Sequence, residues 1–341
     1  MTAASPLSTP LCGLLDCTYP ILQAGMGGVA RAELVAAVAE AGGYGFLGMV
    51  REAPELIAAE IDAVRAATDR PFGVNLIPAA TGPDLLAAEL AVCFDKAVHS
   101  LCFFWDVDAD AIARAKDAGC RVVYQVGSVA DALAAEAAGA DIVIAQGFEA
   151  GGHVRGRLSS LVLLPQVVAA VALPVVASGG FASGESLVAA LALGAQGIHC
   201  GTAFLATQES FAHDYHKERL VSAPGEATVH TDAFAINWPP ASAVRVIANS
   251  LTDSLGGQLY GHDPAALPRD AVALDSGRAI YRFSTDSPLR TTTGDLEALA
   301  LYAGQVAGLI DDIPPAASRV ADIVDGAHAA LARLKTMGDK Q

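Results

Sequence analysis

The sequence predicts an α/β chain folded as a (β/α)8 TIM barrel, with a smaller helical insertion after the eighth strand and closing helices at the C-terminus. Eight short apolar runs lie between residues 20 and 202, and segments of helical spacing separate them. The runs are apolar almost throughout, as is typical of parallel strands buried on both faces. A doubly wound sheet is the alternative, but no G-x-G-x-x-G motif follows the first run.

Each expected strand ends in glycine or a polar residue. The clearest helices between strands are residues 32–43 and 184–195, where alanine-rich helical spacing ends near a glycine, and Ser183 is suited to cap the second. Strict alternation of strand and helix favours parallel strands closed into a barrel. The eight expected strands are residues 20–25, 44–50, 71–77, 97–104, 121–126, 141–147, 174–180 and 197–202.

The regular alternation stops after residue 205. Residues 206–293 contain an Ala-Pro-Gly turn and a Trp-Pro-Pro sequence, and we expect them to form a smaller, mostly helical domain that acts as a substrate lid. Helical spacing returns in residues 294–310 and 315–336, which are expected to be two closing helices. The barrel domain is therefore predicted to comprise residues 10–205 and 294–336.

The composition is that of a globular protein with an acidic surface. Hydrophobic residues make up 53% of the 341 residues, and the net charge is −16. This charge repels nucleic acid and anionic lipid, so we expect neither as a partner. No signal peptide or transmembrane pattern is visible and the six cysteines form no C-x-x-C pair, which predicts a cytoplasmic protein. A mean hydropathy of +0.41 indicates a buried subunit interface, as in a homodimer.

Glycines at the ends of the seventh and eighth expected strands predict a phosphate site. One turn reads Ser178-Gly179-Gly180 and the other Gly201-Thr202. Glycines let the backbone approach a ligand, and the free N–H groups of such turns bind phosphate at this position in TIM barrels. Tight turns that bind no ligand are the structural alternative.

Amide side chains, rather than lysines or carboxylates, stand at other strand ends. Gln23, Asn75, Gln125 and Gln146 lie there, whereas none of the five lysines does. This pattern disfavours Schiff-base chemistry and a catalytic metal, and amides suit a flat heterocycle with mixed donors and acceptors. Together with the phosphate site, the amides predict flavin mononucleotide (FMN) as the cofactor.

His153 is the candidate catalytic residue. It lies in the stretch QGFEAGGHVRG, residues 146–156, which follows the sixth expected strand. A histidine there can act as a general base or, when protonated, hold an anion, and capping of the glycine turn is the structural alternative. Arg155 and Arg157 either assist His153 or lie on a solvated loop.

Other residues have two explanations each. His213 and His216 stand three apart and could ligate a metal, although a solvated helix face is the ordinary explanation. His199 either packs in the core or contacts the cofactor. Three aromatic residues either form apolar walls of the substrate pocket or belong to the core: Phe104, Trp105 and Trp238.

The chain resembles the nitronate monooxygenase family of flavin barrels. The resemblance is carried by the stretches PILQAGMGGVARAELVAAVAEAGGYG, DRPFGVNL, IVIAQGFEAGGH, PVVASGGFASGESLVAALALGAQGIHCGTAFLAT and LYAGQ. It implies FMN as cofactor and the oxidation of alkyl nitronates, or nitroalkanes, by O2 to a carbonyl compound and nitrite. His153 takes the place of the family histidine. The implied flavin contacts are Ala24, Gly25, Met26, Asn75, Gln125, Gln146, Gly151, Ser178, Gly179, Gly180, His199, Cys200, Gly201 and Thr202.

Similar families leave other functions open. The EAGGH stretch also looks like that of flavin enoyl-acyl-carrier-protein reductases and quinone reductases, which take electrons from NAD(P)H. The first turn reads GMGG, where many nitronate monooxygenases have a proline before the methionine, so the substrate stays open. Two further alternatives are a flavin-free barrel lyase or isomerase and a non-catalytic flavin-binding protein.

Overall fold

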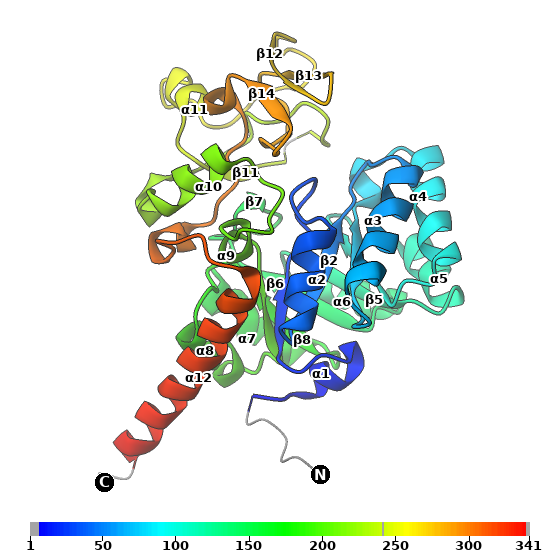
Figure 1. Cartoon of the computed structure of the whole chain (residues 1–341), viewed down its shortest axis with the longest axis vertical. Coiled ribbons are helices and arrows are strands. Elements are labelled where there is room, and N and C mark those ends of the chain that lie inside the picture. Colours follow the sequence, from blue (N-terminus) through cyan, green and yellow to red (C-terminus); the bar gives the residue numbers. More distant parts are fainter. Residues whose placement is uncertain (1–6, 241, 339–341) are drawn as a thin grey trace.

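The computed structural model describes residues 7–240 and 242–338, and its centre is a closed barrel of eight parallel strands (Figure 1). Each strand pairs with the next barrel strand, and β1 closes the ring on β9 with Gln23 opposite Cys200. The strands coincide with the eight predicted runs, which confirms the predicted barrel. They are β1 (Ile21–Gln23), β2 (Tyr44–Gly48), β3 (Gly73–Leu76), β4 (Ser100–Phe104), β5 (Arg121–Val126), β6 (Ile142–Gln146), β8 (Val175–Ser178) and β9 (Gly197–Cys200).

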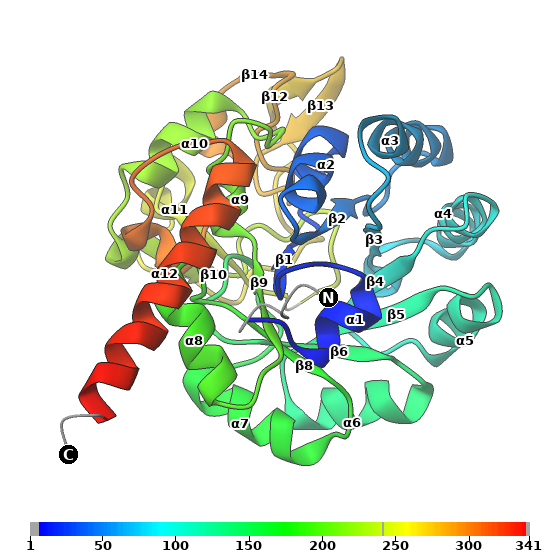
Figure 2. The ribbon, with the colours of Figure 1, turned by 60° about the horizontal axis from the view of Figure 1, so that its bottom comes forward.

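One helix follows each barrel strand from β1 to β8, and these helices surround the barrel in Figure 2. After β9 comes only the short α9 (Thr202–Leu205), and the long α12 (Ala316–Gly338) takes the remaining place, packed against α8 and α2. The closing helix expected at residues 315–336 is therefore confirmed. The surrounding helices are α2 (Ala32–Glu40), α3 (Pro54–Ala67), α4 (Pro83–Asp95), α5 (Ala109–Asp117), α6 (Val129–Ala138), α7 (Ser160–Ala170) and α8 (Gly184–Ala192).

The helix boundaries follow local signals in the sequence. Pro54 and Pro83 stand at the first positions of α3 and α4, where the missing N–H costs no helical hydrogen bond. Ser183 caps α8 as predicted, since its side chain accepts the Ser186 N–H in a reciprocal capping box. Gly139 ends α6 in the left-handed conformation, with φ at 100°.

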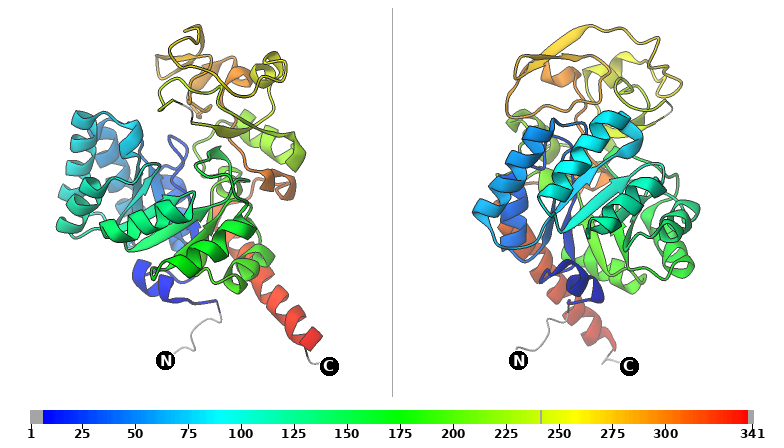
Figure 3. Two further views of the ribbon diagram at one scale, coloured as in Figure 1. Left: turned by 180° about the vertical axis from the view of Figure 1, so that it is seen from behind. Right: turned by 90° about the vertical axis from the view of Figure 1, so that its right-hand side faces the viewer.

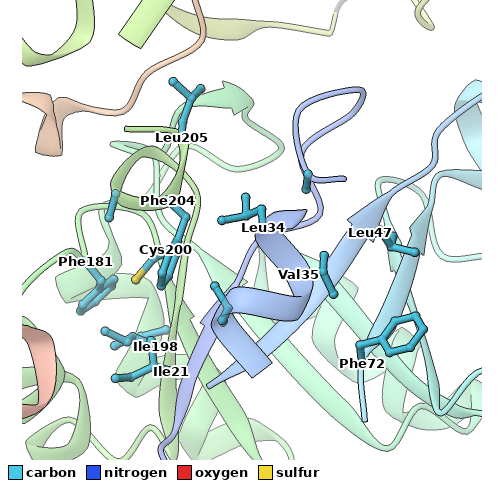
Figure 4. Packing of buried hydrophobic residues seen from close by; sticks show 14 of the residues in the cluster. Ile21, Leu34, Val35, Leu47, Phe72, Phe181, Ile198, Cys200, Phe204 and Leu205 are labelled. Carbon is cyan, nitrogen blue, oxygen red and sulfur yellow. The ribbon is translucent and has the colours of Figure 1, made fainter. Parts of the chain in front are cut away.

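The hydrophobic core has one part outside the barrel wall and one part inside it. Outside the wall, side chains of the strands, such as Ile21 and Ile198, and of the helices, such as Leu34, belong to one buried cluster (Figure 4). Inside it, apolar side chains of the strands fill the barrel, and Leu11 and Leu15 of α1 (Pro10–Leu15) pack against them. With α1 at the N-terminal end of the barrel, the C-terminal end is left for a ligand.

The insertion after β9 lies at the end of the molecule opposite both termini (Figures 1 and 3). The expectation that this insertion is mostly helical is wrong, because it contains several strands as well as short helices. β10 and β11 form a sheet with β7 (Gly152–His153), a two-residue strand in the loop after β6, and β13, β12 and β14 form another. Its elements are α10 (Asp214–Val221), β10 (Thr228–Thr231), β11 (Val244–Ile247), α11 (Ser250–Ser254), β12 (Ala271–Asp275) and β13 (Arg278–Tyr281), followed by β14 (Thr292–Gly294).

The helix expected at residues 294–310 does not form. This segment instead contains two 3-10 turns, η3 (Leu296–Ala298) and η4 (Gln305–Leu309). Two further 3-10 turns, η1 (Pro78–Ala80) and η2 (Gly225–Ala227), lie in other parts of the chain. Gly304 precedes η4 and lies so close to the barrel that an added Cβ would be 2.9 Å from the Gly151 nitrogen. Among the described residues, we find no helix with the length and apolar character needed to span a membrane.

The contact of α12 with α8 depends on the absence of a side chain at Gly184. A Cβ at this position would lie 1.9 Å from the Ala327 nitrogen. We expect Gly184→Ala to lower the melting temperature by about 1.5–4 °C, because overpacking costs roughly 1–3 kcal/mol and 1 kcal/mol shifts the melting temperature of a chain of this length by about 1.4 °C. Differential scanning fluorimetry measures this change. Gly13→Ala in α1, where no atom lies within 4 Å of the added Cβ, is the control; an equal loss in both variants would contradict the packing argument.

Candidate active site

A cavity of about 590 Å³ lies where the C-terminal ends of the barrel strands meet the insertion. Strand ends and the turns after them form its barrel side, and residues of the insertion and of the segment after it form the rest. Almost every residue predicted for the site lines this one cavity. These residues are Ala24, Gly25, Met26, Asn75, Gln125, Gln146, Gly151, His153, Ser178, Gly179, Gly180, His199, Gly201 and Thr202.

Cys200 is the predicted contact that the structure does not bring to the cavity. Its side chain packs in the core between barrel and helices with Ile198 and Phe204 (Figure 4). Burial raises the pKa of this thiol to about 12. Successive side chains of a strand point to opposite faces, so His199 faces the barrel interior and Cys200 faces the helices. Only the backbone of Cys200 remains near the site.

Glycines bring the backbone close to the cavity on its barrel side. A Cβ at Gly25 would lie 2.2 Å from the Asn75 Cβ, and a Cβ at Gly151 would lie 2.4 Å from a backbone nitrogen of the C-terminal segment. Gly179 and Gly180 have φ values of 88° and 83°, which other residues adopt only with strain. These turns therefore require glycine, and they leave backbone groups at the cavity wall for a ligand.

His199 lies in the barrel floor of the cavity with one nitrogen unpaired. Its Nδ1 lies 3.1 Å from Ser178 Oγ, whereas its Nε2 is buried and has no hydrogen-bond partner. Burial lowers the pKa of His199 to about 3, so the ring is neutral at physiological pH. An unpaired polar atom in a cavity wall is unusual in a packed core and favours contact with a ligand.

The three predicted amides of the cavity differ in how their hydrogen-bonding capacity is used. Asn75 donates from Nδ2 to the Cys102 carbonyl at 3.0 Å. Gln146 donates to the His153 carbonyl at 2.9 Å and accepts the Arg155 N–H at 3.1 Å, so it holds the loop rather than a ligand. The backbone of Gln125 pairs with β4 and β6, but its side chain makes no hydrogen bond within the described part of the chain, so its amide is available.

His153 lies in β7, between the barrel and the insertion. Its backbone pairs with Val244 of β11, and its ring stacks on Trp238 with centroids 3.4 Å apart and planes inclined by 16°. Trp105 lies edge-on at 6.0 Å. The Nε2 atom is buried without a hydrogen-bond partner. The imidazole therefore packs among aromatic rings, and neither ring nitrogen has a hydrogen-bond partner within the described residues.

The surroundings of His153 favour its neutral form. Burial, reinforced by the positive charge of Arg51, lowers the pKa of His153 well below its ordinary value of 6.5. A neutral imidazole can accept a proton but cannot hold an anion by charge. Of the two functions left open by the sequence, anion binding by a charged His153 is therefore disfavoured, and proton removal stays a prediction.

The two arginines after His153 do not reach the cavity. Arg155 pairs with Asp106 at 2.8 Å, and its guanidinium carbon lies 5.3 Å from the centre of the Trp105 ring. Arg157 is exposed. Among the aromatic candidates, Phe104 and Trp238 line the cavity, and Trp105 packs behind them.

The histidine pair of α10 serves the fold. His213 caps the helix, with Nδ1 accepting the Tyr215 N–H at 3.1 Å, and His216 is fully buried with Nε2 3.0 Å from the Tyr302 carbonyl. The ordinary explanation, a solvated helix face, is therefore wrong for His216. Residues 7–240 and 242–338 hold no group of three His, Cys, Asp or Glu side chains placed to bind a metal ion.

Sequence reasoning missed the cavity residues that follow β2 or belong to the insertion. Arg51 lies just after the end of β2, a position that a survey of every strand end would include. Thr285 and Tyr302 come from beyond the barrel strands, and no pattern in the sequence points to them. Their contribution depends on how the insertion folds over the barrel.

The chain matches a known protein family over most of its length. The model of the family described as nitronate monooxygenase matches residues 8–326. The (3aS,4S,5R,7aS)-5-hydroxy-7a-methyl-1-oxo-octahydro-1H-indene-4-carboxyl-CoA dehydrogenase of Mycobacterium tuberculosis is 34% identical, over 93% of this chain and 95% of its own length.

Two solved structures are similar over nearly the whole chain. FabK from Thermotoga maritima has a TM-score of 0.80 and 30% identity, with 96% of this chain and 99% of that chain covered. The nitroalkane oxidase from Streptomyces ansochromogenes has a TM-score of 0.79 and 32% identity, with 96% and 100% covered. By the family match over residues 8–326, this chain belongs to the nitronate monooxygenase family and is a flavin-dependent oxidoreductase.

Proposed function

We propose that this protein uses FMN and O2 to oxidise alkyl nitronates to a carbonyl compound and nitrite, and that His153 removes the α-proton of a neutral nitroalkane. The observation that carries the proposal is the state of His153. It is a neutral imidazole with an unpaired Nε2 in a residue that lines a cavity large enough for a ligand. A neutral imidazole with a free nitrogen can accept a proton, and the aromatic rings around it limit the access of water.

The barrel side of the cavity fits FMN. His199 Nε2 and the Gln125 amide have no partners, so both can bond to the polar edge of a heterocycle. The glycine turn at Gly179 and Gly180 precedes α8 and suits a phosphate group. When bound, FMN supplies the two-electron acceptor of the reaction and passes the electrons to O2.

Three contacts fix the position of His153 against this cavity. The Gln146 side chain holds its carbonyl, Trp238 holds its ring, and Val244 of β11 pairs with its backbone. Contacts from both the barrel and the insertion therefore hold the His153 ring in one position beside the cavity. A base held in place loses little entropy when it meets the substrate.

The comparisons support this reaction and also favour a second candidate. The Streptomyces structure is that of a nitroalkane oxidase, which agrees with nitro compounds as substrates. The Mycobacterium relative is named a dehydrogenase of a carboxyl-CoA compound. This name favours an alternative in which the flavin exchanges electrons with NAD(P)H, as in a reductase or dehydrogenase of the same fold.

Anaerobic reduction separates the two candidates. We expect the purified protein to be yellow, and its flavin absorption to bleach on mixing with ethyl nitronate but not with NADH or NADPH. Stopped-flow absorbance spectroscopy measures both reactions. Bleaching by NADH or NADPH alone would favour the reductase and reject nitronate oxidation. A colourless protein that cannot be reconstituted with FMN would reject both candidates.

Replacement of His153 tests proton removal. We expect His153→Ala to keep its flavin and its turnover of ethyl nitronate, and to lose about 100-fold or more in kcat/KM for nitroethane, because base catalysis contributes about 10²–10⁴-fold. Oxygen consumption with each substrate measures the two effects. Nitroethane turnover at the wild-type rate would show that His153 is not the base.

The pH dependence of the wild-type protein tests the protonation state of the base. Because burial holds the pKa of His153 well below 6.5, the neutral form that accepts the proton is already complete at pH 6.5. We therefore expect kcat/KM for nitroethane to be level between pH 6.5 and 8 and to fall only in more acidic solution. A titration centred at or above pH 6.5 that His153→Ala abolishes would contradict this expectation.

Substitution of Gln146 tests whether its side chain holds the loop that carries His153. Gln146→Leu removes both hydrogen bonds to residues 153–155, and we expect the Arg155 amide to exchange with solvent about tenfold faster, as loss of roughly 1.4 kcal/mol of local stability predicts. Hydrogen–deuterium exchange measures this rate. Gln125→Leu, an amide of the same cavity without such bonds, is the matched control and should leave exchange at Arg155 unchanged. Equal exchange in the two variants would show that Gln146 does not hold the loop.

A further inference from the structure

Arg51 lines the cavity from the barrel side and reaches the insertion. It follows β2, and its guanidinium donates to the Asn237 carbonyl and, from Nη2, to Thr285 Oγ1 at 3.3 Å. The guanidinium carbon lies 5.9 Å from the centre of the Trp238 ring, the same indole on which His153 stacks. The cation of Arg51 and the ring of the proposed base, His153, therefore both contact the indole of Trp238.

The charge of Arg51 is not balanced by a carboxylate. Within the described residues it forms no ion pair, and its hydrogen-bond acceptors are a carbonyl and a hydroxyl. Glu52, the next residue, is engaged by Arg31 at 3.1 Å. Buried Glu89 has its pKa raised to about 8 by desolvation, so it is mostly protonated at neutral pH.

The other arginines of the cavity are all paired. Arg31 contacts Glu52 and, at 3.7 Å, Glu60, and Arg278 contacts Asp286 at 2.7 Å. Among the arginines that line the cavity, Arg51 is therefore the one with donors to spare for a negatively charged ligand. A guanidinium donates two parallel hydrogen bonds to a planar pair of oxygens, as in a carboxylate or a nitronate.

The backbone of Arg51 also has an unusual conformation for a residue other than glycine. Its φ is 58°, in the left-handed region that a residue with a Cβ seldom adopts. Such strain persists where the surrounding structure fixes it, and it is concentrated at functional sites. Glycine would relieve the strain at this turn but would remove the guanidinium.

We propose that Arg51 is the specificity-determining residue that binds the two oxygens of an anionic substrate group beside His153. The inference rests on the proposed function, since it gives the nitronate oxygens their binding partner. A planar anion replaces the neutral acceptors of the Arg51 guanidinium, and the base and the anion site are then separate residues. Arg51 therefore selects anionic nitronates over neutral nitroalkanes.

Nitrate, a planar anion that contains the same O–N–O group, tests the anion site without any turnover. Flavin-loaded wild-type protein is expected to bind nitrate, as measured by calorimetry and by the fluorescence of its two tryptophans. Arg51→Met should weaken nitrate binding about 10- to 100-fold, since a hydrogen bond to a charged group contributes about 1.5–3 kcal/mol. Arg51→Lys should lie between the two proteins. Arg157→Met, an exposed arginine near His153, is the matched control and should bind as the wild type does.

Steady-state kinetics with ethyl nitronate and nitroethane tests whether Arg51 determines the preference for the anionic substrate. Arg51→Met should raise the KM for ethyl nitronate by the same factor and leave the KM for neutral nitroethane within about threefold. It should also lower kcat for nitroethane, because negative charge develops on the same two oxygens when His153 removes the proton. Flavin content and melting temperature show whether the variant is folded. No nitrate binding by the wild type, or an unchanged nitrate affinity in Arg51→Met, would overturn the inference. Nitrate binding that depends on Arg51, in a protein that does not oxidise nitronates, would support the anion site and reject the proposed function.

Discussion

The candidate site depends on the pairing of two residues, Gly152 and His153, with strand β11 of the insertion. The loop that contains them starts at the end of β6 in the barrel. Antiparallel pairing with Val244 and Arg245 ties it to the insertion, and Trp238 then stacks on the His153 ring. Barrel and insertion thereby close one cavity, and the histidine stands at the border between them. Gly152, with φ at 72°, allows the turn that brings the chain onto β11.

In this proposal, His153 and Arg51 have different charge states and therefore different roles in the cavity. Burial keeps His153 neutral, and the adjacent positive charge of Arg51 favours the same state. A protonated histidine could hold an anion but could not take a proton, so a single histidine cannot do both at one pH. With the permanent cation on Arg51, the imidazole remains free to act as a base. The acidic protein as a whole attracts no anion from a distance, so the local cation carries that function.

The barrel could be predicted from the sequence because its strands are buried on both faces and read as continuous apolar runs, and because Ser183 and the glycines mark element ends. Most of the site followed, since strand ends converge in this fold. Cys200 was misplaced although it directly follows His199 on β9, and strand alternation alone would have separated them. The insertion is harder to predict, because its strands are short and β12 and β13 each have a single buried residue. Thr285 joins the site only through that fold, and no local pattern in the sequence indicates it.

The proposed base and the separate anion site both require that His153 is a neutral imidazole at physiological pH. A nitrogen NMR titration of protein labelled at histidine, with the His153 signal assigned by its loss in His153→Ala, tests it most directly. His153 is expected to keep the chemical shifts of a neutral ring down to a pH well below 6.5. A His153 signal that titrates at or above pH 6.5 would contradict this expectation, because burial would then not hold the pKa of His153 below its ordinary value.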